Sequence, residues 1–307
     1  MSESDSLSAL PGPEPLARRA HGSGDSWVQG PNGAKYWGAF GAAGLLVVHR
    51  QTGVLLQHRA EWSHFGGTWG LPGGARHESE SAAQAAIREA EEEAGVPGNE
   101  LALRFESVLD LGWWSYTTVV ADAPALFAPV VGDAESLELR WVGFDQVGAL
   151  PLHPGFATRW PSLLGDLEVH PRLIVDVANV IGSRPDGWWR DRAAATERFV
   201  RSLDAAVHGG IPAALLGATH DVWWPTVTAV IEGQARSMAA SPSVIEVVRA
   251  PRDGDTSILE VAASAVSRAE GPVTVVTADR ELARRVVSAG ARVIAPGELL
   301  RVLDALT

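Results

Sequence analysis

Cysteine is missing from this chain of 307 residues. A protein without cysteine forms no disulfide, holds no metal through thiolates and has no cysteine nucleophile. Long apolar runs are missing too, and none approaches the roughly 18 residues that a membrane-spanning helix needs. The first residues, MSESDSLSALPGPEPLARR, are polar and acidic, and they lack the pattern of a secretion signal. We therefore expect a cytoplasmic protein that does not enter a membrane.

Positive charge is scarce in the first half of the chain. The formal net charge is −12, and residues 1–168 carry −11 of it, with 10 basic and 21 acidic side chains. Residues 169–307 are close to neutral, with 15 basic and 16 acidic side chains. Since a nucleic-acid backbone attracts positive surfaces, the first half is a poor candidate for binding one.

Length and composition predict two domains, because one domain commonly has about 150 residues. Residues 1–26 are rich in Ser, Pro, Gly and charge, and we expect a mobile tail there. His170-Pro171 marks a boundary. We therefore expect one domain over residues 27–167 and a second over residues 168–307.

The first half reads as mixed α/β. Two apolar runs split by Thr52-Gly53 predict a β-hairpin. Strand-like pieces follow between Leu101 and Asp122, and LELRWVGFDQV predicts a further strand. Residues 154–164 predict a short helix that closes this half of the chain.

One stretch, GARHESESAAQAAIREAEEEAGV at residues 74–96, stands out by its spacing. From Ser81 to Ala94 it has neither Pro nor Gly, which predicts a helix with Ser81 at or near the N-cap. Gly95 suits the left-handed position at the end of a helix. Alanines at every fourth position form a stripe that is suited to close packing against a sheet.

Three glutamates share one face of this expected helix. Glu89, Glu92 and Glu93 are spaced i, i+3 and i+4, a spacing at which like charges repel. A merely structural helix gains nothing from such a cluster. A hard divalent cation between the carboxylates would explain it, because Mg²⁺ takes oxygen ligands. Arg88 could orient the group or partly neutralise it.

The spacing of this stretch is that of the Nudix box, G-x5-E-x7-R-E-U-x-E-E-x-G-U, where U is aliphatic. A solvated acidic helix face would explain the glutamates, but not the glycines and the arginine in register with them. Ala90 is a small occupant of its aliphatic position. The specified positions that match are Gly74, Glu80, Arg88, Glu89, Ala90, Glu92, Glu93, Gly95 and Val96. The sequence therefore resembles the Nudix hydrolases.

The resemblance implies the α/β/α sandwich of that family, with a mixed sheet, over about residues 35–167. It also implies a Nudix-type pyrophosphohydrolase that cleaves the diphosphate of a nucleoside diphosphate derivative. Water would attack phosphorus with help from Mg²⁺, or Mn²⁺ in its place. The metal ligands would be Glu89, Glu92 and Glu93, with Glu89 also a candidate base. Glu80 would be a helper rather than a direct ligand.

Several side chains outside the box are candidates for substrate binding. Arg59 and Arg76 could bind phosphate oxygens, since a guanidinium suits bidentate contact with phosphate, and either could equally form a surface ion pair. Trp69 could stack on a base or pack in the core. Glu138, like Glu135 just before it, could supply an acid from outside the box.

The segments around the box favour a nucleoside triphosphate as substrate. HFGGTWGLPGG at residues 64–74 most resembles the MutT-like group, although its GG-x-W-x-L-PGG pattern is widespread in the family. The patterns typical of ADP-ribose and NADH enzymes are not evident. LLQHRA at residues 55–60 matches only the start of a coenzyme A signature. We therefore expect a (d)NTP-like nucleotide.

The second half alternates short apolar runs with helical stretches, which predicts a doubly wound parallel sheet. In such sheets ligands bind outside the carboxyl ends of the strands. A convergent acidic cluster there would repel itself without cations, so it predicts a metal site for phosphodiester cleavage. The alternative is that these residues simply cap helices. The residues that follow the expected strands are Asp176, Asn179, Glu232, Asp253, Asp255 and Asp279.

The segments DVANVIGS, VIEG, DGD and VTADREL resemble the NYN branch of PIN-like nucleases, which implies a Rossmann-like fold and RNA as a partner. Two positions depart from that family: Val177 replaces the Gly of DGxN, and Ile231-Glu232-Gly233 replaces FDG. We expect Trp188-Trp189 and Trp223-Trp224 in loops, where covering apolar surface is favoured over stacking on RNA bases.

Three hypotheses remain open at this point. The chain is a Mg²⁺-dependent Nudix hydrolase of a (d)NTP-like nucleotide, fused to a PIN/NYN-like domain. Alternatively, the second half is a metal-dependent ribonuclease, and the first half senses or processes a nucleotide or an RNA 5′ end. In the third hypothesis, either half is a ligand-binding module without catalysis.

Overall fold

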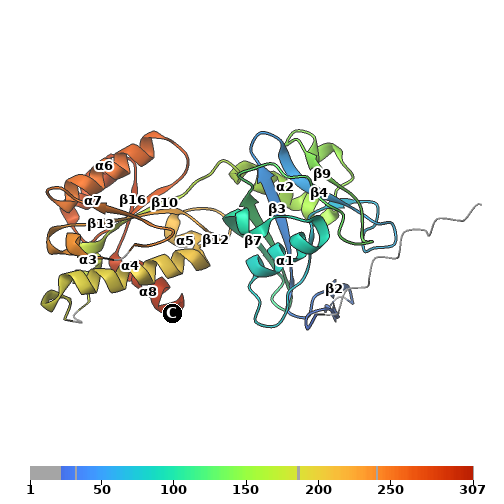
Figure 1. Cartoon of the computed structure of the whole chain (residues 1–307), viewed down its shortest axis with the longest axis horizontal. Helices are drawn as coiled ribbons and strands as arrows, with labels where there is room; N and C mark the ends of the chain where they lie inside the picture. The colour runs from blue at the N-terminus through green and yellow to red at the C-terminus, as the bar shows by residue number, and fades with distance from the viewer. Residues whose placement is uncertain (1–21, 32, 185–186, 240, 307) are drawn as a thin grey trace, which may run out of the picture.

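Two sheets organise the chain in the computed structural model, which describes residues 22–31, 33–184, 187–239 and 241–306. A mixed sheet forms the core of the first half and a parallel sheet that of the second (Figure 1). The expected mobile tail covers residues 1–26, and residues 1–21 of it lie outside the described residues. A small antiparallel hairpin, β1 (Trp27–Gln29) with β2 (Lys35–Trp37), precedes the first sheet.

The first sheet is mixed, as predicted. Its order is β11-β12-β7-β8-β3-β4-β5, with β6 paired to β3 and β9 paired to β4. Strands β3 and β8 run parallel and the other neighbours run antiparallel. The predicted hairpin around Thr52-Gly53 is confirmed as β3–β4. The strands are β3 (Ala42–His49), β4 (Gly53–Arg59), β5 (Trp69–Gly70), β6 (Gly73–Ala75), β7 (Ala102–Asp110), β8 (Ser115–Asp122), β9 (Ser136–Val142), β11 (Ile211–Pro212) and β12 (Val222–Trp223).

Helices cover both faces of this sheet, which makes the first half a three-layer sandwich. The two helices are α1 (Ala82–Ala94) and α2 (Pro154–Asp166), and both were predicted. Alternate residues of β3 point to opposite faces. Leu45 therefore joins the apolar cluster under α1, while Leu46 joins the cluster under α2. Because both faces are covered, β3 is almost entirely apolar and buried.

The second sheet has five parallel strands in the order β14-β13-β10-β15-β16, which confirms the predicted parallel arrangement. The chain leaves β10 toward β13 on one side and later returns to β15 on the other. Ligand sites of open parallel sheets lie at such a reversal. The strands are β10 (Arg172–Asp176), β13 (Thr226–Ile231), β14 (Glu246–Arg249), β15 (Val273–Val276) and β16 (Arg292–Ile294). The helices are α3 (Val177–Gly182), α4 (Arg192–Gly209), α5 (Ala213–Leu216), α6 (Gly254–Ser267), α7 (Arg280–Ser288) and α8 (Pro296–Leu306).

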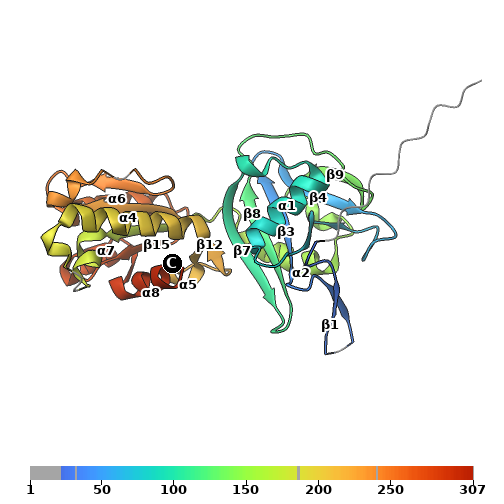
Figure 2. The ribbon, with the colours of Figure 1, turned by 60° about the horizontal axis from the view of Figure 1, so that its bottom comes forward.

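A short hairpin from the second half extends the first sheet, and the sequence did not predict it. Strand β12 pairs with β7, and both views place the two strands side by side (Figures 1 and 2). The expectation that Trp223 lies in a loop is therefore wrong. Trp223 belongs to β12 and is 1% exposed, with its ring centroid 4.6 Å from that of Phe105. Two-residue strands carry no periodic pattern, so sequence reasoning could not find them.

The predicted domain boundary between residues 167 and 168 stays a prediction, because strands β11 and β12 follow it in the sequence yet belong to the first sheet. Along the described ranges, no helix is both long and apolar enough to span a membrane.

Candidate active site

The box helix begins and ends as its sequence predicts. Ser81 is the N-cap: its Oγ accepts a hydrogen bond from Gln84 N at 3.1 Å, and Gln84 Oε1 accepts one from Ser81 N at 2.9 Å. Gly95 ends the helix in the left-handed region with φ 62°. Alanines of α1, including Ala86 and Ala90, are fully buried against the sheet. These features fix the rotation of the helix, and with it the direction of each glutamate.

Gly74 allows the carboxylate of Glu89 to lie directly on the sheet. A Cβ atom at Gly74 would stand 2.6 Å from the carboxyl carbon of Glu89, closer than real Cβ atoms approach their neighbours. Any side chain at position 74 would therefore displace the Glu89 carboxylate from its place on the sheet. Glu89 is 6% exposed.

Arg88 joins two of the box glutamates. Its Nε and Nη2 donate to the two carboxylate oxygens of Glu80 at 2.8 and 3.0 Å, and its Nη1 donates to Glu89 Oε1 at 2.7 Å. The hydrogen bond from Arg88 lowers the pKa of Glu80, while the same contact raises the pKa of Arg88. Glu80 thus holds the arginine that contacts Glu89, and its role as a helper of the metal site stays a prediction.

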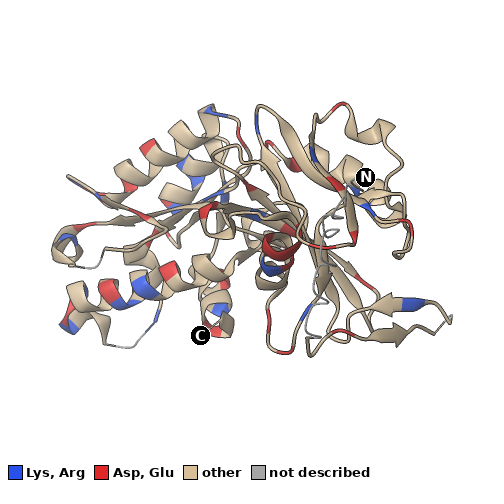
Figure 3. Ribbon diagram, turned by 45° about the vertical axis from the view of Figure 1, so that its right-hand side comes forward, with Lys and Arg blue, Asp and Glu red and all other residues tan. Residues whose placement is uncertain are grey.

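Glu93 and Glu92 extend the acidic group along α1, where Figure 3 shows acidic residues crowded together. Glu93 is 5% exposed, and its Oε2 accepts hydrogen bonds from Gly73 N at 3.0 Å and Gln57 Nε2 at 3.4 Å. The Glu92 side chain is 43% exposed, with Oε1 3.9 Å from Arg88 Nη1. The helix thus presents two buried carboxylates and one accessible carboxylate.

The donor chemistry of these residues fits a hard divalent cation. Glu89, Glu92 and Glu93 offer oxygen ligands of the kind that Mg²⁺ and Mn²⁺ take. Arg88 is the arginine that pairs with these carboxylates, and burying carboxylates in excess of positive charge is costly. Within the described residues, no group of three or more His, Asp or Glu side chains is already arranged to enclose a metal ion. The fit therefore rests on ligand type and charge.

Arg59 lies on the same side of the sheet as the box carboxylates. Its Nε donates to the His64 carbonyl at 3.1 Å. Burial raises the pKa of Tyr116 to about 12, with Arg59 lowering it and Glu93 raising it. Burial, together with the charge of Arg59, lowers the pKa of His153 to about 4. Arg59 and Glu93 therefore act on one common neighbour, the Tyr116 hydroxyl.

Arg76 is directed toward β7. Its Nη2 donates to the Glu80 carbonyl at 2.9 Å, and its Nε is buried without a hydrogen-bond partner among the described residues. Burial raises the pKa of Glu106 on β7, and the charge of Arg76 counters that rise. The phosphate-binding role of Arg76 stays a prediction, because its described partners are protein groups.

Trp69 and Glu138 both have partners from the protein itself. Trp69 is 5% exposed, stacks on His58 at 4.7 Å between ring centroids, and has Arg140 Cζ 4.4 Å from its ring. The core-packing alternative for Trp69 therefore describes this structure. Glu138 lies opposite His58 in the β4–β9 pairing, with its Oε1 3.8 Å from Arg140 Nε.

The acidic residues of the second half meet at one end of the parallel sheet. Asp176 is 5% exposed, and its Oδ2 accepts hydrogen bonds from Asn179 Nδ2 at 2.7 Å and Thr277 Oγ1 at 2.8 Å. Burial raises the pKa of Asp255, and four neighbouring carboxylates raise it further: Asp279, Asp176, Asp253 and Glu232. The predicted residues thus lie near Asp255 or, for Asn179, on Asp176, but no three of the described acidic side chains are already arranged to enclose a metal ion. Thr277 was missed, although it stands directly before the predicted Ala-Asp pair of VTAD.

The helix-cap alternative also holds for part of this group. The side chains of Asp176, Asp253 and Asp279 accept hydrogen bonds from the first backbone N–H groups of α3, α6 and α7. Glu232 accepts a hydrogen bond from Gly254 N at 2.7 Å. Capping explains why acidic residues stand at these positions, and it leaves open what their convergence does.

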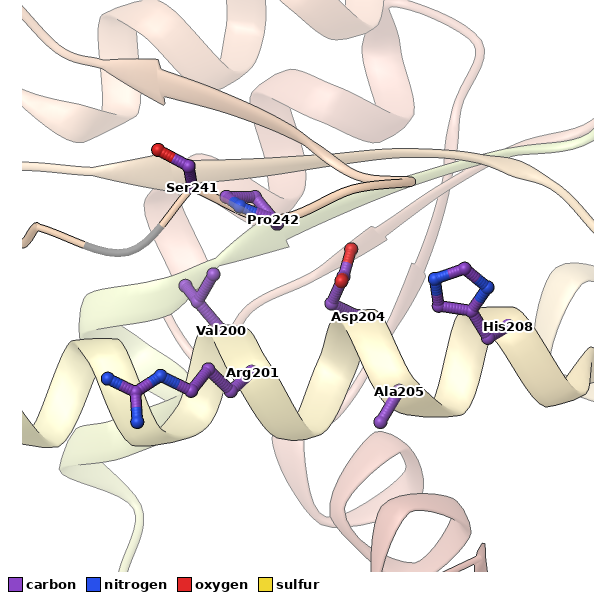
Figure 4. Close-up of a pocket in the computed structure, with 7 residues that line it drawn as sticks. All are labelled: Val200, Arg201, Asp204, Ala205, His208, Ser241 and Pro242. Atoms are coloured by element: carbon purple, nitrogen blue, oxygen red, sulfur yellow. The ribbon is translucent and has the colours of Figure 1, made fainter.

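A cavity of about 340 Å³ lies elsewhere in the second half, between α4 and residues 241–242 (Figure 4). It contains none of the predicted site residues. Asp204 on its wall accepts backbone hydrogen bonds from Ser243, Val244 and Ile245, so this carboxylate anchors the loop beside it.

The first half is thus a three-layer sandwich with a capped, glutamate-rich helix packed on a mixed sheet. Residues 39–162 match the family model of the NUDIX domain. A Mycobacterium tuberculosis protein named "Putative 8-oxo-dGTP diphosphatase 3" is 50% identical over 161 residues, which are 49% of this chain and 74% of that protein. The chain belongs to the Nudix family through this first half, and it is a Nudix-type pyrophosphohydrolase.

Two further relatives match the chain. A Bifidobacterium longum protein, the nucleoside triphosphate pyrophosphatase/Nudix hydrolase fusion protein, is 39% identical over 162 residues, or 50% of this chain and 34% of that protein. The crystal structure of a Nudix hydrolase from Mycobacterium smegmatis, RenU, is 51% identical and covers 46% of this chain and 92% of its own, with a TM-score of 0.43.

Proposed function

We propose that the first half hydrolyses the diphosphate of a (d)NTP-like nucleotide, releasing pyrophosphate and a nucleoside monophosphate. The observation that carries this proposal is the geometry of the box, where Arg88 holds Glu89 and the backbone of Gly73 holds Glu93. The name of the Mycobacterium tuberculosis relative supports an oxidised purine nucleotide, 8-oxo-dGTP, as the first substrate to test.

In this proposal, Glu89, Glu92 and Glu93 would hold Mg²⁺ or Mn²⁺, and the bound cation would neutralise charge on the diphosphate and activate water. Arg88 keeps Glu89 in one orientation, because the two hydrogen bonds that it donates to Glu80 fix its guanidinium. Arg59, at the end of strand β4, binds phosphate oxygens of the substrate. The Tyr116 hydroxyl, with a pKa of about 12, stays protonated at neutral pH.

The test is product release from the purified chain with Mg²⁺ across a panel of nucleotides. The panel contains 8-oxo-dGTP, the common NTPs and dNTPs, ADP-ribose, NADH and dinucleoside polyphosphates. We expect turnover of a nucleoside triphosphate and a loss of at least about 100-fold in Glu93→Gln, since even indirect partners of a metal site can matter that much. A fully active Glu93→Gln variant would reject the metal assignment, and turnover of ADP-ribose alone would reject the substrate.

We propose a second function for the second half: metal-dependent cleavage of RNA by a Rossmann-like domain of the PIN/NYN type, over residues 168–307. The observation that favours it is the position of Asp176, Glu232 and Asp279 around Asp255, where their charges raise the pKa of the Asp255 carboxyl. Mg²⁺ or Mn²⁺ would offset this charge. The first half would then sense or process the nucleotide or RNA 5′ end.

Labelled single-stranded RNA, incubated with the chain and Mn²⁺, tests this second function. The double variant Asp176→Asn with Asp279→Asn should abolish cleavage while Glu93→Gln leaves it intact. Cleavage that survives the double variant would show that another site, or a contaminating nuclease, is responsible.

A further inference from the structure

A buried glutamine faces the box helix from strand β4. Gln57 is 1% exposed, and its neighbours Leu55 and Leu56 are apolar and fully buried. Its Nε2 donates to Ser136 Oγ at 2.7 Å and, through a longer hydrogen bond, to Glu93 Oε2 at 3.4 Å. Its Oε1 is buried and has no hydrogen-bond partner among the described residues. A buried polar atom without a partner is rare enough in proteins to require a reason.

The reason lies in the neighbouring carboxylate. An amide can rotate to exchange its oxygen and nitrogen, and the surrounding hydrogen bonds decide which orientation is favoured. In the reversed orientation, the carbonyl of Gln57 would face a carboxylate oxygen of Glu93, and two acceptors would meet. The present orientation keeps a donor on Glu93 and leaves Oε1 unsatisfied. An apolar residue at this position would avoid that cost, so packing alone does not explain Gln57.

An irregularity in strand β9 supplies the second partner of Gln57. His58 pairs with Glu138, yet Arg59 pairs with Ser136, so Leu137 is an extra residue that bulges outward and is 53% exposed. Because of this bulge, Ser136 shares the face of Arg59 and Gln57 and is 7% exposed. Bulges near active sites commonly redirect a side chain in this way. Ser136 therefore holds the amide that contacts Glu93.

Gln57 adds a neutral donor to one of the two buried box carboxylates. Glu89 accepts a hydrogen bond from the Arg88 guanidinium, and Glu93 accepts hydrogen bonds from Gly73 N–H and the Gln57 amide. A neutral donor orients a carboxylate while leaving its negative charge in place. We propose that Gln57 is a positioning residue, which holds the Glu93 carboxylate in the orientation that binds a divalent cation, and that Ser136 fixes Gln57.

This inference rests on the proposed metal role of Glu93, and its test uses the cation alone. The full chain and all its variants carry Asp176→Asn and Asp279→Asn, so that the proposed site of the second half does not contribute, and this chain is the wild type of the comparison. Its Mn²⁺ binding is titrated and followed by electron paramagnetic resonance. Gln57→Met, which has a similar volume and no donor, should weaken Mn²⁺ binding about 10- to 100-fold, as loss of an outer partner of a metal site does. Ser136→Ala should weaken it less. Ser107→Ala is the matched control, because Ser107 is 4% exposed in the same sheet on β7 and should bind Mn²⁺ like the wild type.

A second readout separates positioning from a merely structural role. Gln57→Glu places a second carboxylate beside Glu93, which raises the pKa of the pair. The pH below which Mn²⁺ binding is lost should therefore rise. A loss of packing would instead lower the melting temperature and leave this pH unchanged. If Gln57→Met does not fold, Mn²⁺ binding is compared between Ser136→Ala, which removes the hydrogen-bond partner of Gln57, and Ser107→Ala, which keeps it.

The outcomes can be assigned separately. A folded Gln57→Met chain that binds Mn²⁺ as tightly as the wild type, with Ser136→Ala unchanged, would overturn the inference. Wild-type chain that binds Mn²⁺ but hydrolyses no nucleotide would instead overturn the proposed function, and the comparison of Gln57 variants would still decide the inference. Wild-type chain that binds no Mn²⁺ would overturn both.

Discussion

The carboxylate of Glu89 packs directly against the Cα of Gly74, and the space between them is too small for a methyl group. The added carbon would lie 2.6 Å from the Glu89 carboxyl carbon. A side chain at position 74 would therefore force the Glu89 carboxylate to move. Several consequences of this and related contacts can be measured.

Gly74→Ala should displace Glu89 and reduce nucleotide hydrolysis by about 10- to 100-fold, a loss typical of disturbed metal ligation. The free energy of unfolding should fall by about 1–3 kcal/mol, as for other overpacked sites. Steady-state kinetics and urea unfolding measure the two effects. Gly148→Ala is the matched control, because a Cβ there meets no atom within 4 Å. Equal activity of the two variants would contradict the steric argument.

Glu80→Gln should remove the ion pair that fixes Arg88. The folded pKa of Glu80 lies below its ordinary value of 4.5, so the pair stabilises the folded chain above about that pH and this stabilisation is lost as the pH falls. The variant should be less stable than the wild type by about 1.5 kcal/mol at pH 7. Chemical unfolding at several pH values should show the gap closing toward pH 3. A gap that is constant with pH would show that charge is not its source.

Asp255→Asn should stabilise the chain, in contrast to most substitutions. Burial and four neighbouring carboxylates raise the pKa of Asp255 above its ordinary value of 3.8, so its charged form opposes folding at neutral pH. The gain should be about 0.5 kcal/mol, since the site is partly solvated. It should disappear below pH 3.8, where the wild-type residue is protonated in both states. Thermal unfolding across this pH range tests the sign, and a destabilised variant at pH 7 would contradict it.

Arg104→Met should loosen the connection between the two halves. Arg104 Nη1 donates to both oxygens of Asp122 at 2.9 and 3.0 Å, and its Nη2 donates to the carbonyls of Leu167 and Val169 at 2.8 and 2.9 Å. Removing one partner of a buried pair costs about 3–5 kcal/mol. We expect a loss of that size in urea unfolding. Arg284→Met, at an exposed ion pair, should change stability by less than about 1 kcal/mol.

Trp223→Ala should destabilise the first sheet, although Trp223 itself belongs to the second half of the chain. Trp223 is 1% exposed and packs on Phe105, so its truncation should cost about 3–5 kcal/mol. Nucleotide hydrolysis should then be lost at a lower urea concentration than in the wild type. Trp189→Ala is a control, because Trp189 is 55% exposed. Unchanged urea resistance of hydrolysis would mean that the first sheet is stable without β12.

The box helix could be predicted from the sequence because each of its signals is local. Ser81 at the N-cap, Gly95 at the C-terminus and the spacing of the glutamates all fall within one short stretch. The parallel sheet was predictable for a similar reason, since each strand is a continuous apolar run. The contact from Gln57 to Glu93 was not predictable, because a single glutamine in an apolar strand does not reveal what it faces. The bulge that turns Ser136 inward depends on the pairing of two distant strands.

The β7–β12 pairing has a consequence for synthesis on the ribosome. Strand β7 ends at residue 110, whereas β12 ends at residue 223. More than a hundred further residues must therefore be made before the β7 edge is covered, which takes roughly 5 to 20 s at typical rates of translation. During that interval the nascent chain exposes an unpaired strand edge, the kind of surface on which chains aggregate. Slower translation of residues 111–223 would lengthen this interval, and a chaperone bound to the β7 edge would protect it.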